Sequence, residues 1–294
     1  MRNLRILPKV RDSWSYLYVE HARIDQEDKG ICLHDSRGKV HVPCASLSLL
    51  MLGPGTSVTH AAVMTMAEAG CLVAWCGEQG IRFYAQGMGE TRSAANLLRQ
   101  ASIWSDETQR LQVVRKMYEV RFDEHLNPDL TLRQIRGKEG ARVRDSYAKA
   151  SERYGVPWAG RNYDRSDWDR SDPINRALSA ANACLYGVVH AAIVACGYSP
   201  ALGFIHTGKM LSFVYDIADL YKTEIVVPAA FMETAKGKDE LESRVRYRCR
   251  DLFAQTKLLA RIVEDLSSLF DLEATGNAAP AVDLEVALPG AIWD

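Results

Sequence analysis

The sequence predicts an α+β protein, with a small β-rich domain at the N-terminus followed by a larger all-α catalytic domain. Residues 14–85 contain short alternating runs rich in Val, Ile and Tyr that are separated by turn residues. Helical periodicity dominates from residue 93 onward. We therefore place a β-rich domain at residues 1–86, a linker at 87–92, a helical domain at 93–273 and an acidic tail rich in Ala and Pro at 274–294.

The composition is that of a globular protein with a sizeable core. The 294 residues are 47% hydrophobic and 25% charged. No apolar run approaches the roughly 20 residues that span a bilayer, and the first residues lack the apolar core of a signal peptide. The seven cysteines have no Cys-x-x-Cys spacing, which is typical of reduced thiols. We expect a cytoplasmic protein without a membrane segment.

The charge distribution indicates phosphate-binding surfaces in spite of a net charge of −1. No Lys or Arg follows Arg261, but seven acidic residues do, so the chain without those seven acids carries a net charge of +6. Basic residues concentrate between Arg133 and Arg153 and between Lys236 and Arg261. Such clusters are typical of nucleic-acid binding, although a solvated helical face is the alternative for either one.

The β-rich domain is expected to begin with a meander. Residues 14–43 are interrupted at Lys29-Gly30 and at residues 36–38, which predicts about three strands. Further strands are expected at residues 46–52, 71–75 and 81–85, and a short helix at residues 61–69 that ends at Gly70.

Capping signals place the long helices of the second domain. One helix is expected around Leu97–Ile103 and a second around Leu111–Phe122. Thr131 begins a third with a capping box to Gln134, and Asp172 caps a fourth whose first residue is Pro173 and which ends at Gly197. Another helical pattern follows Gly208, and a final helix is expected at residues 239–270.

Two aspartates and a histidine mark the segment after Gly197 as a candidate metal site. Asp216 and Asp219 are three residues apart and lie beside the apolar stripe of their helix, while His206 occupies the loop before it. Carboxylates near a core are costly unless they are paired or bind a metal. One imidazole with two carboxylates suits a hard divalent ion. Solvated aspartates and a packed histidine are the alternative.

Glu139 is a third candidate, on a different helix. Ile135, Glu139, Val143 and Tyr147 are spaced by four, so the acid lies in line with inward-facing residues. Together with His206 and Asp219 it makes a plausible metal site, with Asp216 as a supporting or alternate ligand. The alternative is an ion pair within the helix to Lys138 or Arg142.

Two motifs resemble those of the CRISPR adaptation integrases, the Cas-one family. Residues 136–142, read as RGKEGAR, are similar to its R-G-x-E-G-x-R motif. Residues 203–220, read as GFIHTGKMLSFVYDIADL, are similar to its second signature, and the order Glu, His, Asp matches its metal triad. The resemblance covers residues 10–270 and is closest to the type I-E branch.

The resemblance implies roles for individual residues. Glu139, His206 and Asp219 would bind Mg²⁺ or Mn²⁺, and Asp216 would be a further acidic member of the catalytic set. Tyr163 and Trp168 would be available to stack on a DNA end or a displaced base. The residues expected to contact DNA are Arg82, Arg136, Lys138, Arg142, Lys209, Arg244, Arg246 and Arg248.

The function implied is that of a metal-dependent DNA integrase and endonuclease. It would join the 3′-hydroxyl ends of short prespacer duplexes into the CRISPR array by transesterification. The family works as a homodimer, and two dimers flank a small ferredoxin-like Cas-two partner in a heterohexamer, which the tail from Ala274 would help to dock by strand addition. Two alternatives are a structure-specific nuclease on branched DNA and a non-catalytic DNA-binding scaffold.

Overall fold

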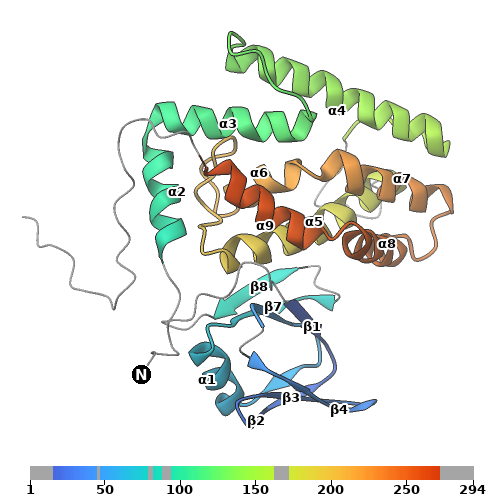
Figure 1. The fold of residues 1–294 in the computed structure, drawn as a ribbon. Helices are drawn as coiled ribbons and strands as arrows, with labels where there is room; N and C mark the ends of the chain where they lie inside the picture. The colour runs from blue at the N-terminus through green and yellow to red at the C-terminus, as the bar shows by residue number, and fades with distance from the viewer. Residues whose placement is uncertain (1–15, 45–46, 79–81, 88–93, 162–171, 272–294) are drawn as a thin grey trace, which may run out of the picture.

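The computed structural model describes residues 16–44, 47–78, 82–87, 94–161 and 172–271. A β-rich region lies beneath a larger set of helices, which confirms the predicted α+β class (Figure 1). The strands are β1 (Tyr16–Val19), β2 (Arg23–Glu27), β3 (Gly30–Asp35), β4 (Gly38–Val42), β5 (Leu49–Leu52), β6 (Ser57–Val58), β7 (Leu72–Cys76) and β8 (Phe83–Gly87). Helix α1 (His60–Glu68) lies between β6 and β7.

The strands form two four-stranded sheets rather than one meander. The first has the order β1-β5-β7-β8, in which only β8 is antiparallel to its neighbour, and the second has the order β4-β3-β2-β6. Residues 16–42 therefore contain four strands where about three were expected. The additional break lies at His21, whose φ of 51° turns the chain from one sheet into the other.

One core lies between the two sheets and a second joins the domains. Ile24, Ile31, Leu50 and Met66 are fully buried in the first. In the second, alternate residues of β5 and β7, such as Leu49 and Leu72, pack against Ala191, Val194 and Ala195 of helix α5 (Pro173–Ala195). The ring of Phe83 on β8 also stacks on His190 of α5, with centroids 3.8 Å apart.

The helical domain is built around α5. The remaining helices are α2 (Ala95–Ser105), α3 (Glu107–Phe122), α4 (Leu132–Tyr154), α6 (Ser212–Asp219), α7 (Val227–Ala235), α8 (Leu241–Gln255) and α9 (Leu258–Leu269). Helices α6, α7, α8 and α9 all pack against α5. The predicted N-terminal caps are confirmed, because Asp172 accepts from the Asn175 amide and Thr131 forms its capping box with Gln134.

Helix α5 corrects the expectation about membrane-length segments. Its 23 residues are apolar enough, by length and composition, to cross a bilayer. The helix is instead packed against other helices and the first sheet, and most of its apolar stretch is buried inside the protein. Core helices of globular proteins pass the same test.

One helical expectation is wrong in detail. The single helix expected at residues 239–270 is divided into α8 and α9 at Lys257, which adopts a φ of 49°. The pattern that carries Asp216 and Asp219 ends at Asp219 and is followed by a π-helical turn, η4 (Lys222–Val226). Helix α7 then begins, with Pro228 in its first turn.

Candidate active site

Two carboxylates predicted to act together meet at a single arginine. Glu139 projects from α4 and Asp219 from the end of α6, and Nη1 of Arg121 on α3 contacts both. The Arg121 nitrogen hydrogen-bonds to Glu139 Oε1 and lies 3.7 Å from Asp219 Oδ2. The three side chains are 9%, 22% and 15% exposed for Arg121, Glu139 and Asp219 respectively. The structure therefore brings together two acids that are 80 positions apart in the printed sequence.

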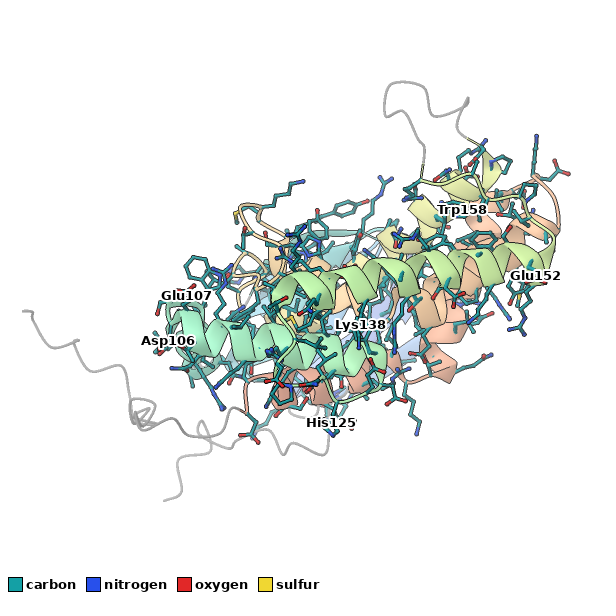
Figure 2. The ribbon with its side chains drawn as sticks, turned by 90° about the horizontal axis from the view of Figure 1, so that it is seen from above. Asp106, Glu107, His125, Lys138, Glu152 and Trp158 are labelled. Atoms are coloured by element: carbon teal, nitrogen blue, oxygen red, sulfur yellow. The ribbon has the colours of Figure 1, made fainter. Side chains whose placement is uncertain are left out.

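The pairing of Glu139 within its own helix does not occur. Lys138 and Arg142 flank it on α4, but both are directed to Glu124, with Arg142 Nη2 2.8 Å from Glu124 Oε2. Figure 2 shows α4 lying alongside α3, with Lys138 near the end of α3 that leads to His125. Glu139 is left to the buried Arg121 of the neighbouring helix.

A second cation balances Asp219. Nζ of Lys222, in the π-helical turn, lies 2.5 Å from Asp219 Oδ1 and over the ring of Tyr186 at 4.9 Å. Burial alone would lower the pKa of Lys222, but the neighbouring Asp219 and Tyr186 outweigh it and the pKa is raised. The amine is therefore held in its charged form beside the carboxylate. π-Helical turns occur frequently at functional sites.

Asp216 organises the loop that carries His206. Its carboxylate is fully buried and accepts backbone hydrogen bonds from Phe204 at 2.6 Å, Ile205 at 3.0 Å and His206 at 2.8 Å. Its Oδ1 also lies 2.7 Å from Nδ1 of His206. Both oxygens of Asp216 are therefore used in this structure, by the loop amides and by the imidazole.

The hydrogen bond to Asp216 selects the state of the His206 ring. It raises the pKa of His206, and burial opposes the rise; Asp219 raises the pKa further and Lys222 lowers it. In the neutral ring, the N–H at Nδ1 donates a hydrogen bond to Asp216, and Nε2 keeps a free electron pair. A carboxylate that fixes the far nitrogen in this way is the usual arrangement for a metal-binding histidine. The side chain is 44% exposed, so ligands can reach it.

The donor set fits a divalent ion, although no three acidic, His or Cys groups of the described residues are close enough to form a metal cluster in this structure. Asp219 Oδ1 is buried and forms the ion pair with Lys222. Carboxylate oxygens and one imidazole suit Mg²⁺ or Mn²⁺. Two of the candidate ligands, Glu139 and Asp219, both contact Arg121.

The residues expected to contact DNA fall into two groups. Arg82, Arg136 and Lys209 have exposed side chains, as do Lys138 and Arg142, which are paired with Glu124. On α8, Arg244 is engaged internally: it donates to the backbone oxygens of Glu233 and Gly237 and lies 3.5 Å from the Glu233 carboxylate. That contact network holds the turn between α7 and α8, so Arg244 is not free for a phosphate in this structure.

The other two residues of α8 that were expected to contact DNA, Arg246 and Arg248, differ from Arg244. Arg246 donates to Ser243 Oγ at 2.9 Å, and the Nε of Arg248 is buried without a hydrogen bond. Tyr163 and Trp168, which were expected to stack on DNA, lie outside the described residues, as does the tail from Ala274.

Arg121 and Lys222 were missed by the sequence-based prediction. The signal for Arg121 was present, because it falls on the buried stripe of α3 with Met117, Tyr118 and Phe122, where a charge needs a partner. Lys222 stands three residues after Asp219, at the spacing of an ion pair on a helix.

Comparisons with known proteins agree with this fold. The family described as CRISPR associated protein Cas1 matches residues 15–127 and 121–243. A CRISPR-associated endonuclease Cas1 2 of Thermus thermophilus is 54% identical over 293 residues, which cover 100% of this chain and 90% of that protein. The CRISPR-associated endonuclease Cas1 of Escherichia coli K12 is 45% identical, over 96% of this chain and 92% of that protein.

A solved structure of a TtCas1–DNA complex is also similar. It is 55% identical, covers 90% of this chain and 99% of that chain, and superimposes with a TM-score of 0.83. Matches of this extent cover both domains and all of the candidate ligands. The chain therefore belongs to the Cas1 family of CRISPR-associated proteins.

Proposed function

We propose that this protein is a metal-dependent DNA endonuclease and integrase of CRISPR adaptation. It joins the 3′-hydroxyl ends of short prespacer duplexes to the CRISPR array by transesterification. The observation that carries the proposal is the convergence of Glu139 and Asp219, together with a His206 ring whose far nitrogen is fixed by Asp216. The relatives' names as endonucleases and the similar TtCas1–DNA complex support it.

Glu139, Asp219 and Nε2 of His206 would hold the Mg²⁺ or Mn²⁺. When bound, that ion supplies Lewis-acid stabilisation of the negative charge that develops on the phosphodiester oxygens. Asp216 keeps the imidazole in the required tautomer and orientation through its Nδ1 contact. It also fixes the loop backbone that leads into His206 through three consecutive amides.

The reaction is a displacement at phosphorus. The attacking 3′-hydroxyl oxygen forms a bond to phosphorus and loses its proton, and the bond to the leaving 3′ oxygen breaks, after which that oxygen is protonated. One phosphodiester replaces another, so no external energy source is needed. With water as the attacking group the same displacement is hydrolysis, which accounts for nuclease and integrase activities in one site.

The exposed cations would position the DNA rather than read its sequence. Arg136 on α4 and Lys209 in the His206 loop flank the site, and Arg82 lies in the β7–β8 hairpin. Contacts from Lys and Arg to phosphates fix the register of a duplex and weaken with added salt. We also propose the homodimer and the heterohexamer with a Cas-two partner. Removing the residues after Asp271 is then expected to weaken co-purification of the partner, and unchanged co-purification would exclude a docking role for the tail.

A strand-transfer assay tests the proposal. The protein and its small partner are mixed with a labelled duplex bearing free 3′-hydroxyls, a supercoiled plasmid with a repeat array, and Mn²⁺ or Mg²⁺. Wild type is compared with His206→Ala and with a matched control, His34→Ala, which removes a half-exposed histidine from β3 in the other domain. We expect the label to join the plasmid with wild type and the control only, and chelator to abolish joining.

Other results select the alternatives. Cutting of branched DNA without joining would identify a structure-specific nuclease. DNA binding that is unchanged in His206→Ala, with neither cutting nor joining by wild type, would identify a scaffold. Joining that persists in His206→Ala would show that the reaction is right and the assigned ligands are wrong.

A further inference from the structure

Arg121 occupies the position between two carboxylates where a divalent ion would bring positive charge. Its Nη1 contacts Glu139 and approaches Asp219. We infer that Arg121 is an internal counter-cation that competes with the divalent metal for Glu139 and Asp219. The inference rests on the proposed function, because it concerns the same metal site.

The placement of Arg121 on α3 is specific. It lies on the buried stripe of that helix, its side chain is 9% exposed, and it contacts α4 and α6 at once. An arginine keeps its charge at every accessible pH, so it always offsets one of the two negative charges. Without it, two ionised carboxylates would face each other in a poorly solvated space.

Charge balance shows why this neutralisation matters for the metal. Glu139 and Asp219 contribute two negative charges, and Arg121 and Lys222 contribute two positive charges. A bound divalent ion would add two more positive charges among the same groups. Metal binding therefore requires the Arg121 ion pairs to weaken or break. The free energy lost in this way makes the binding of the metal less favourable.

Lys222 is a weaker competitor than Arg121 by geometry. It contacts only Asp219, through Oδ1, and its long aliphatic side chain carries a single ammonium that can turn toward solvent or a phosphate. Arg121 contacts both acids and is the more buried of the two cations. Arg121 is thus the residue whose removal should change the affinity of the pair of carboxylates.

The experiment measures metal binding directly, without DNA or turnover. Mn²⁺ is titrated calorimetrically into metal-free full-length protein, as wild type, Arg121→Gln and Arg121→Lys. We expect Arg121→Gln to bind Mn²⁺ about tenfold or more tightly than wild type, which corresponds to about 1.4 kcal/mol. Arg121→Lys keeps the charge but loses the guanidinium group that reaches two acids. Its Mn²⁺ affinity should lie between those of wild type and Arg121→Gln.

The matched control is Arg115→Gln on the same helix. Arg115 donates to the backbone oxygens of Asn127, Pro128 and Leu130 and touches neither acid. This change removes the same charge and also breaks hydrogen bonds, so it should lower stability and leave Mn²⁺ affinity within about twofold of wild type. A general loosening of α3 would instead affect Arg115→Gln and Arg121→Gln alike.

Thermal unfolding gives a second readout of the same idea. In chelator, Arg121→Gln should melt below wild type because Glu139 loses its buried cation and Asp219 loses one of its two cations. Saturating Mn²⁺ should raise the melting temperature of the variant more than that of wild type. If Arg121→Gln is unfolded in chelator, Mn²⁺ is expected to restore its structure. Failure of Mn²⁺ to do so would contradict the inference.

Ligand variants separate failure of the inference from failure of the proposed metal site. If Asp219→Asn and Glu139→Gln bind Mn²⁺ as wild type does, the metal site itself is wrong. If both lose Mn²⁺ but Arg121→Gln binds no more tightly than wild type, the site is right and Arg121 does not compete. Tighter binding in Arg121→Gln that is lost in Arg121→Gln/Glu139→Gln would support the inference.

Discussion

His190 makes the stability of the contact between the two domains depend on pH. Its ring stacks on Phe83 with centroids 3.8 Å apart, and burial lowers its pKa from 6.5 to about 4. In the unfolded chain the ring titrates at about 6.5. Between these two values the unfolded state binds more protons than the folded state, so the free energy of unfolding falls as the pH is lowered. The stabilisation is fully present above about pH 6.5 and lost toward about pH 4.

The size of the effect follows from the two pKa values. Their difference corresponds to at most about 3–4 kcal/mol between neutral pH and a pH below both values. The ring is only partly buried, and contact with solvent reduces this figure. We therefore expect His190 to account for a loss of about 1–2 kcal/mol in the free energy of unfolding between about pH 7.5 and about pH 4.5.

Urea unfolding of wild type and His190→Leu across this pH range measures the loss. Leucine keeps an apolar contact with Phe83 and does not titrate, so the variant should lose less stability on acidification than wild type by the amount given above. His125→Leu, which removes a fully exposed histidine, serves as the control and should follow wild type. Parallel pH profiles for wild type and His190→Leu would refute the reasoning, because they would mean that the folded protein protonates His190 freely.

Three further predictions concern single contacts. Asp216→Asn leaves an amide facing backbone N–H donors in a fully buried position. We expect thermal unfolding to show a loss of about 3–5 kcal/mol of stability and calorimetry to show a loss of Mn²⁺ binding. Wild-type Mn²⁺ affinity would show that the loop does not depend on this carboxylate. Phe270→Ala removes a fully buried ring that stacks on Tyr198, and we expect urea unfolding to show a loss of about 3–5 kcal/mol in stability. A loss below about 1 kcal/mol would mean that the end of α9 is not part of the core. Thr131→Ala removes the capping box of α4 and should cost about 1 kcal/mol, and an unchanged urea midpoint would argue against that cap.

Local signals predicted the helix starts and failed at several turns. The caps at Thr131 and Asp172 depend on one side chain meeting nearby amides, so they can be recognised from a few residues. The breaks at His21 and Lys257 occur at residues with positive φ that are not glycine. Nothing in the residue type announces that conformation, because the surrounding packing enforces it. The number of strands and the division of the last helix were therefore out of reach.

The candidate ligands were easier to predict than the charges around them. Glu139, His206 and Asp219 stand in short motifs with a recognisable order, and Glu139 also interrupts an apolar stripe. Arg121 interrupts the stripe of α3 in the same way, but its two acidic partners lie on α4 and α6, far away in the sequence. A mismatch on one helix becomes informative only when the matching charge on another helix is considered with it.

The pairing of Glu139 shows what tertiary structure adds to spacing. Lys138 and Arg142 are its nearest cations in sequence, and an exposed pair with either would contribute only a few tenths of a kcal/mol, about 0.2–0.5. The fold assigns both to Glu124 and gives Glu139 the buried Arg121 instead. A buried ion pair of this kind is weak support for stability, because desolvation offsets much of its attraction. This weak net contribution suits the proposed role of Arg121, which is to pair with Glu139 and Asp219 and to release both acids when a divalent ion binds them.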